Sequence, residues 1–584
     1  MVRRRRVTTM QIAPRDQRRL LYRVCAVLIA MRVVSIFTVD LNGLEVSAAH
    51  GLGAVAPLGL GGVPVLGKIV SAWMHISGHI AGVVRLPSIA LDLALLLIAV
   101  GYARLNGWGT LVGLLSGMFL ALAPFGLDEG WRADGTPLMS VLALSALFQA
   151  RKGIKLGQTA PSFVSAGLLA AATAISPVAA LLLPAGLYTA MRSVTGPKPK
   201  YTLAAAWIVA IGVGIGLRLV VADGMPPQAS LAAAWLADAR FNGADIALPD
   251  GALDGFFEAL IALSPGGATG ELAASLQLHE APAWRVWLGA TLWPLALAGL
   301  FVGQVIADPA IPKRAAVSDS AGAGAADGWR SLGVAVPTSP KILGERDYMP
   351  LLLGMLVPCG WVAWACARSN PAGIPEALAI ARPCCALVLG LGLTGLAGAR
   401  FGAEDHQRRR FVATMVAVTL VQFALGGHHV LVGTSSMQRI AATKVAVFIN
   451  EEVSPLGDKG AVIALGPHGL EVAYKLDPYQ SADRVARSTT RPRDAAQIAE
   501  KLLEKPRSVI AVTGDRDAVE ANGIAIGGGQ GAGMVIDRLL HTRGYTIEED
   551  GARYLEAIAV RVYRHDGPTG GIAIKPQLAP GVAP

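Results

Sequence analysis

The sequence predicts a polytopic α-helical membrane protein with a C-terminal α/β domain, and its composition and charge distribution support this prediction. Of the 584 residues, 53% are apolar and 16% are charged, and the mean hydropathy is +0.49, whereas soluble domains have about 25% charged residues. The 154 residues from Leu431 onward hold 36 charged side chains, 18 of each sign, so the first 430 residues carry the whole net charge of +10. These observations exclude a soluble enzyme. They indicate that the excess of basic residues reflects membrane topology and does not form a nucleic-acid-binding surface.

The predicted spans begin with a retained N-terminal helix. A basic segment, 1–19, precedes the apolar run 20–39, which lacks a small-residue cleavage site followed by polar sequence. The stretch 162–191 is interpreted as two passes, because basic residues flank both of its ends and Ser176-Pro177 favours a turn. The pattern then predicts about eleven spans, at 20–39, 86–104, 109–126, 136–150, 162–175, 177–191, 202–221, 286–307, 348–368, 382–401 and 411–430.

The basic residues predict how the chain is oriented. With eleven spans, the cytoplasmic segments hold 23 of the 33 basic residues in the first 430, and 14 acidic residues fall in the outer loops. We therefore expect a bacterial inner-membrane protein with a cytoplasmic N-terminus, a transmembrane domain over 20–430 and a periplasmic domain over 431–584. The loop 308–347 is then cytoplasmic, and long outer loops at 40–84 and 222–285 are where function usually concentrates.

The soluble region predicts an alternation of strands and helices. Short apolar segments at 461–465, 508–512, 545–547 and 557–563 are typical of strands, and helices are expected at 468–476, 494–504 and 531–542. The glycine-rich segment 527–533 has neither the GxGxxG spacing nor a Walker lysine, so it does not predict a nucleotide site. The five cysteines all lie in predicted spans and form no disulfide or zinc motif.

An ordered set of motifs resembles a known family. A carboxylate follows the first span; then come the loop GVPVL, a surface helix over 67–84, RLPS at the second span, ALAPFG, WRADGTPL and the hairpin TAISPVAALLLP. In this order the motifs resemble the GT-C glycosyltransferases. Within that superfamily they are similar to the bacterial branch of lipid A aminoarabinose transferases and protein O-mannosyltransferase-like enzymes. The resemblance covers residues 20–200.

The resemblance implies an enzyme that takes a sugar from a polyprenyl-phosphate donor and transfers it to a lipid, glycan or protein acceptor at the outer membrane face. Membrane lipid is a further partner, and nucleic acid is not. Such chemistry needs a carboxylate that positions or deprotonates the acceptor, and cations or a metal that stabilise the departing phosphate. The resemblance specifies no cofactor, and a divalent metal ion stays open. His75 and His79 share a helix face, which is acceptable geometry for two metal ligands, but no third ligand is fixed.

The catalytic candidates carried over from the family are carboxylates. Its Asp-Glu pair aligns with Leu44-Glu45, so Glu45 or the nearby Asp40 must serve as base. The Asp of the second outer turn matches Asp134. Each of the three acids also has an ordinary structural interpretation, as solvated loop charge for the first two and as the N-cap of a span for Asp134.

The substrate-binding candidates lie in the same predicted outer loops. The family often has a lysine where this chain has Ser176, so the donor phosphate must rely on other cations. The candidates are Lys68, Arg85 and Arg132, with the acids Asp128 and Glu129 beside them. Arg85 could instead be an interfacial anchor.

Two further functional classes remain open. One is a lipid or solute transporter, against which no internal repeat is found. The other is a non-catalytic GT-C relative that acts as an envelope scaffold, which the losses at Leu44 and Ser176 favour. Asp92 and Arg218 are ionisable groups inside or near spans, where such groups are costly; each serves either function or helix packing.

Overall fold

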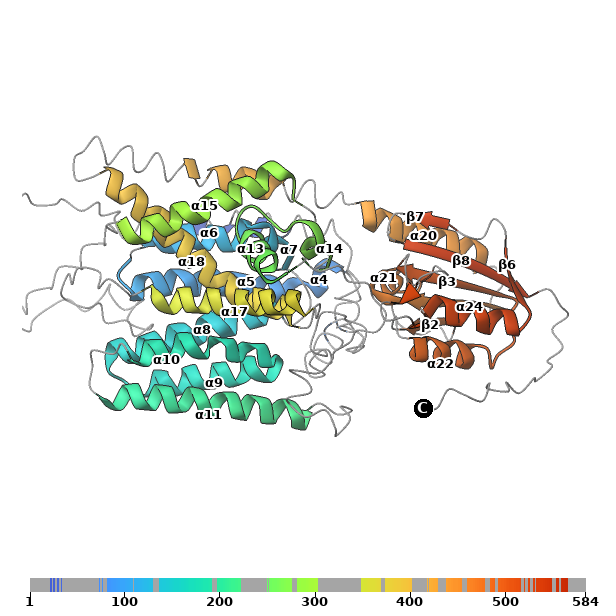
Figure 1. The fold of residues 1–584 in the computed structure, drawn as a ribbon, viewed down its shortest axis with the longest axis horizontal. Coiled ribbons are helices and arrows are strands. Elements are labelled where there is room, and N and C mark those ends of the chain that lie inside the picture. The colour runs from blue at the N-terminus through green and yellow to red at the C-terminus, as the bar shows by residue number, and fades with distance from the viewer. Residues whose placement is uncertain are drawn as a thin grey trace, which may run out of the picture. The chain divides into compact units, whose positions relative to one another are not determined.

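A computed structural model describes two compact units of the chain (Figure 1). We call the elements before residue 437 the helical unit and those from Met437 onward the sheet unit. The described residues are 81–108, 110–129, 136–191, 197–221, 251–275, 281–302, 348–368, 373–401, 420–428, 437–453, 459–477, 484–488, 492–515, 532–548, 553–555 and 558–565, with a few isolated positions and pairs.

The helical unit contains the apolar helices. They are α4 Ala81–Val84, α5 Leu86–Leu105, α6 Thr110–Leu122, α7 Pro124–Glu129, α8 Thr136–Leu156, α9 Ala160–Ile175, the 3₁₀ helix η1 Pro177–Leu182, α10 Leu183–Met191, α11 Pro197–Val221, α13 Ala252–Ala262, α14 Gly270–Ser275, α15 Ala283–Val302, α17 Met349–Ala367 and α18 Ile374–Phe401.

Four helices in the described ranges are long and apolar enough to cross a membrane. They cover Leu86–Leu105, Tyr201–Arg218, Met349–Ala367 and Ile374–Leu396. Shorter apolar helices occupy Val112–Leu122, Ala160–Ile175 and Pro177–Met191. The total of eleven spans stays a prediction, since most of the first span and part of the last lie outside the described residues.

Two predicted spans differ from the observed helices in an informative way. The span predicted at 109–126 is broken after Leu122, because Pro124 has no N–H to continue the ladder of α6 and starts α7 instead. The span predicted at 382–401 begins eight residues earlier, at Ile374. The turn predicted at Ser176-Pro177 is present, with Ser176 in an extended conformation between α9 and η1.

Helix α18 is the centre of the helical unit. Every residue of its apolar stretch 374–396 is buried, and α18 packs against α6, α8, α15 and α17. Helix α11 instead lies at one side of the unit next to α9 (Figure 1), with apolar side chains exposed on its outer face, among them Ile208, Val209 and Val213. This distribution is typical of a bundle whose surface contacts lipid.

The sheet unit is built on a mixed sheet with strand order β2-β1-β3-β8-β6, to which β7 adds by pairing with β8. Its strands are β1 Gly460–Leu465, β2 Val485–Ser488, β3 Val509–Asp515, β6 Tyr545–Ile547, β7 Arg553–Leu555 and β8 Ile558–His565. Strands β2, β1 and β3 are parallel, and β8 is antiparallel to β3. A separate pair, β4 Ile524–Ala525 and β5 Gly529–Gln530, is antiparallel.

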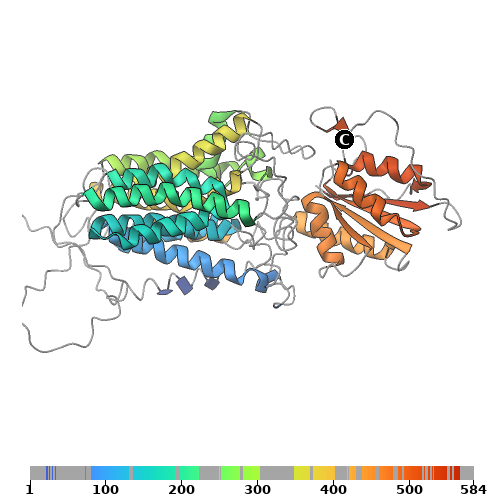
Figure 2. The same ribbon diagram turned by 90° about the horizontal axis from the view of Figure 1, so that it is seen from below.

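Helices cover both faces of this sheet (Figure 2). Helices α20 Met437–Val453 and α21 Gly466–Leu476 pack on one face, against residues such as Val462 and Val560. Helices α22 Pro492–Leu502 and α24 Ala532–Thr542 pack on the other, against Ile463 and Tyr563. The alternation of inward side chains along each strand produces these two apolar layers.

The sheet unit contains a buried tyrosine whose ionisation should affect stability. Tyr563 is 1% exposed, and its hydroxyl donates to Asp537 Oδ1 at 3.0 Å. Burial raises the pKa of Tyr563 well above its ordinary value, and the charge of Asp537 raises it further. Because the unfolded pKa is about 10, the folded state binds this proton more tightly. The resulting stability is present below about pH 10 and is lost as the pH rises above it.

We therefore expect Tyr563→Phe to remove a phenol that ionises only at high pH. Ultraviolet absorbance of phenolate, recorded while the pH is raised, should lose a component that appears late in the titration of the wild type, and stability should fall less steeply above about pH 10. If the variant instead loses an absorbance component that appears early in the pH titration, the result would contradict the burial of the Tyr563 hydroxyl.

Candidate functional site

Arg85 and helix α7 lie at the same end of the helical unit, and helix directions define that end. Gly390 of α18 lies against Ser116 of α6, and Arg382 lies against Leu120, so the two helices are antiparallel. Gly117 of α6 packs against Leu96 of α5, whose direction is also opposite to that of α6. The starts of α5 and α18 therefore lie at the same end as α7, and we call this the α7 end.

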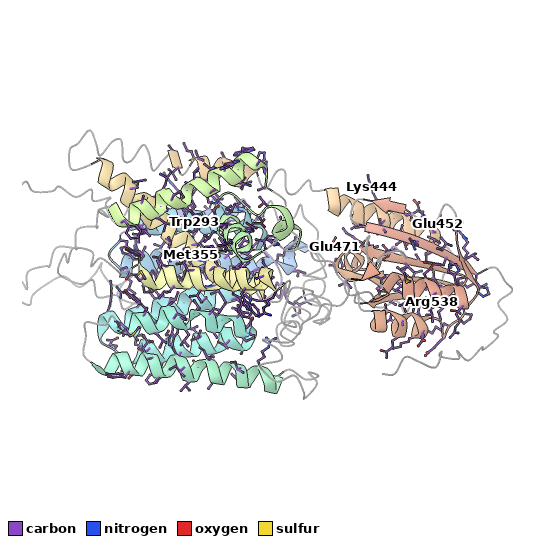
Figure 3. All side chains as sticks on the ribbon, viewed as in Figure 1. Trp293, Met355, Lys444, Glu452, Glu471 and Arg538 are labelled. Atoms are coloured by element: carbon purple, nitrogen blue, oxygen red, sulfur yellow. The ribbon has the colours of Figure 1, made fainter. Side chains whose placement is uncertain are left out.

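The chain around α13 packs onto the α7 end. Gly267 has a positive φ of 87° and lies so close to Pro124 of α7 that an added Cβ would be 3.0 Å from the proline Cγ. The indole of Trp293 on α15, labelled in Figure 3, donates to the Leu260 carbonyl of α13 at 2.8 Å. Part of the predicted outer loop 222–285 is thus helical and covers the approach to α7.

Arg85 is the candidate residue that the structure describes in full. It occupies the N-cap position of α5, and its side chain is 1% exposed. An interfacial anchor would leave its guanidinium at the surface, so the burial disfavours that alternative. A buried guanidinium requires acceptors or an anion around it, which is a suitable property for a residue that binds phosphate.

Two more arginines are buried toward this end, and the motifs of the sequence do not single them out. Arg285 is 2% exposed, and its Nε donates to the Pro265 carbonyl at 3.0 Å. Arg382 is 4% exposed and pairs with Asp92 at 2.7 Å. Neither arginine was selected as a candidate from the sequence. The predicted boundaries placed Arg285 just before one span and Arg382 at the first residue of another.

Ionisable groups inside the spans were predicted to serve function or packing. Asp92 is buried and contacts Arg382, so it joins α5 to α18. Arg218 Nη1 donates to the Ile175 carbonyl at the end of α9, at 2.6 Å. Ser176, at the turn between α9 and η1, is 2% exposed. These contacts hold the helix ends of the α7 end together.

The other candidates are placed only in part. Asp128 and Glu129 end α7, although their side chains are not described. The remaining five, Asp40, Glu45, Lys68, Arg132 and Asp134, lie outside the described residues, so their mutual distances stay predictions. The same holds for His75 and His79; within the described ranges, no three metal-ligating side chains of His, Cys, Asp or Glu form a group.

No protein-family model matches the chain, and no curated protein matches it by sequence. Among solved structures, it is similar to ArnT from Cupriavidus metallidurans bound to undecaprenyl phosphate, with 12% identity, a TM-score of 0.41 and coverage of 94% of this chain and 98% of that one. The apo form of ArnT gives 13% identity, the same TM-score and the same coverage.

Two other transferases show weaker or more partial similarity. The oligosaccharyltransferase of Archaeoglobus fulgidus gives 12% identity and a TM-score of 0.45, with coverage of 85% of this chain and 69% of that one. Arabinosyltransferase EmbB from Mycobacterium smegmatis gives 14% identity and a TM-score of 0.28, with coverage of 68% and 44%.

Proposed function

We propose that the protein is a membrane glycosyltransferase. It transfers a sugar from a polyprenyl-phosphate donor to a lipid, glycan or protein acceptor at the periplasmic face of a bacterial inner membrane. The observation that carries the proposal is the buried guanidinium of Arg85 at the α7 end. The resemblance of the motif order adds the reaction class.

The buried arginine suits the leaving group of this reaction. When the glycosidic bond breaks, negative charge develops on the lipid phosphate, and a preorganised guanidinium away from bulk water stabilises it strongly. Arg85 lies at the start of an apolar helix, where a polyprenyl chain has apolar surroundings. Lys68 and Arg132 are the proposed supporting cations, and a divalent ion could add to them.

The carboxylates complete the proposed chemistry. Glu45 or Asp40 positions and deprotonates an acceptor hydroxyl, and Asp134 organises the site with Asp128 and Glu129 beside it. If the replacement of the family aspartate by Leu44 has abolished this step, the chain is a non-catalytic relative that still binds the lipid phosphate.

We expect Arg85→Ala to weaken binding of undecaprenyl phosphate by about 10- to 100-fold, because one charge-assisted hydrogen bond contributes about 1.5–3 kcal/mol. Titration of purified protein in nanodiscs with undecaprenyl phosphate measures this. Arg85→Lys should retain part of the affinity, since the charge remains but the bidentate geometry is lost.

The matched control is Arg368→Ala. Arg368 is an exposed arginine that follows α17, next to the start of α18 at the same end, and its loss should leave binding unchanged. Equal affinity of wild type and Arg85→Ala would refute the assignment of Arg85. Failure of the wild type to bind any polyprenyl phosphate would refute the proposed donor.

A further inference from the structure

The break between α6 and α7 leaves a backbone carbonyl without its normal partner. In a continuous helix the Leu120 carbonyl would accept from the N–H of residue 124, but residue 124 is a proline and has none. Neighbouring helix bonds continue across the break, from Ala123 N–H to Phe119 O at 3.2 Å and from Leu127 N–H to Ala123 O at 2.8 Å. The break is thus a local kink at which the Leu120 carbonyl lacks its helical donor.

Arg382 of α18 supplies the missing donor. Its Nη2 donates to the Leu120 carbonyl at 2.7 Å and approaches the Gly126 carbonyl at 3.4 Å. Gly126 lies in α7, and only a glycine fits there: an added Cβ would overlap the Leu120 carbonyl and lie 3.1 Å from Nη2 of Arg382. One guanidinium nitrogen therefore bridges the end of α6 and the start of α7.

Asp92 orients this guanidinium. Its Oδ1 accepts from the same Nη2 at 2.7 Å, and both side chains are buried. The three contacts join α5, α18 and the α6–α7 kink through a single group.

Stability alone is a poor explanation for this arrangement. A buried ion pair is often replaced by apolar side chains without loss of stability, because removing both charges also removes their desolvation cost. Apolar side chains cannot, however, donate hydrogen bonds to the carbonyls at the kink. The distinctive effect of the pair is therefore on the position of α7, which ends at Glu129 and is followed in sequence by Arg132 and Asp134.

We infer that Arg382 is a positioning residue of the transferase: held by Asp92, it fixes the α6–α7 kink and so places α7, which ends in Asp128 and Glu129, for sugar transfer. The inference rests on the proposed function for its catalytic consequence. Its structural part, the restraint of α7, stands independently of that function.

The test replaces the pair by apolar residues of similar size in the full-length protein, as Asp92→Leu with Arg382→Met. This double variant should melt close to the wild type, because no buried charge is left unpaired. It should lower kcat for sugar transfer by about 100-fold, since a displacement of about 1 Å at a catalytic group costs that much, with KM for the lipid donor unchanged. Amide hydrogen exchange in 123–129 should become faster.

Arg382→Lys is the conservative variant, and it should restore part of kcat because an ammonium also donates to carbonyls. The matched control is Asn106→Leu with Arg151→Met, which removes a buried arginine contact of 2.8 Å far from α7 and should keep the wild-type kcat. If the double variant at Asp92 and Arg382 does not fold, the test uses Arg382→Lys alone. Its kcat for sugar transfer and its amide hydrogen exchange in 123–129 are then compared with those of the wild type.

The outcomes separate this inference from the proposed function. Wild-type kcat in the double variant, or unchanged exchange in 123–129, would overturn the positioning role. If the wild type transfers no sugar from any polyprenyl phosphate, the proposed function fails, and the exchange measurement alone then decides whether Arg382 restrains α7. A parallel rise in KM and loss of thermal stability without a change in kcat would show a structural role only.

Discussion

Glu45→Gln combined with Asp40→Asn should reduce sugar transfer by about 100- to 10,000-fold. General-base catalysis contributes about this factor, and both substitutions keep the size of the side chain while removing the carboxylate. Because Leu44 stands where the family has its aspartate, these two acids are the proposed bases. Transfer from an undecaprenyl-phosphate sugar in proteoliposomes measures the effect, and binding of undecaprenyl phosphate should stay at the wild-type level.

The control for this double variant is Asp254→Asn. Asp254 is an exposed acid in the first turn of α13, so its change should leave transfer unaffected. Transfer at the wild-type rate in the Glu45 and Asp40 double variant would remove both residues from the mechanism and transfer the role of base to Asp134.

Gly392→Leu should strongly destabilise the helical unit. A Cβ built on Gly392 of α18 overlaps the Ala296 carbonyl of α15, and one built on Gly299 overlaps the Gly392 carbonyl. Since the obstacles are backbone atoms, the two helices must separate, and overpacking of this kind costs about 1–3 kcal/mol or more. The gain in helix propensity, about 1 kcal/mol, does not offset it. Thermal unfolding in detergent, followed by tryptophan fluorescence, measures the loss.

Gly360→Leu is the matched control in the neighbouring helix α17. A Cβ at Gly360 meets no atom within 4 Å, so leucine there should leave the melting temperature unchanged or raise it slightly through better helix propensity. Equal melting temperatures for the Gly392 and Gly360 variants would contradict the close approach of α15 and α18.

Hydropathy and turn signals predicted much of the element pattern. The strands expected at 461–465 and 508–512 correspond to β1 and β3, and the hairpin at Ser176-Pro177 is present. The start of α18 was missed by eight residues, because charges at Glu376 and Arg382 interrupt the apolar run. Since Arg382 is paired inside the bundle, its charge did not end the helix. Tertiary pairing is not visible in a local window of sequence.

The site was only partly predictable for the same physical reason. Arg85 was selected as a candidate because it begins the RLPS motif at the start of the second span, and its side chain is buried. Arg382 and Asp92 are 290 residues apart in sequence, and no local pattern relates them. One signal was present, the Pro124 that removes a donor for the Leu120 carbonyl. It indicates that some other residue must donate, without saying which.

The most direct test of the proposed function is sugar transfer by the purified wild-type protein in proteoliposomes, with a panel of undecaprenyl-phosphate sugars and a membrane-lipid acceptor. We predict that one of these donors is consumed, that undecaprenyl phosphate is released in equal amount, and that Arg85→Ala slows the reaction. Absence of transfer from every donor, together with absence of binding to undecaprenyl phosphate, would contradict the assignment as a glycosyltransferase.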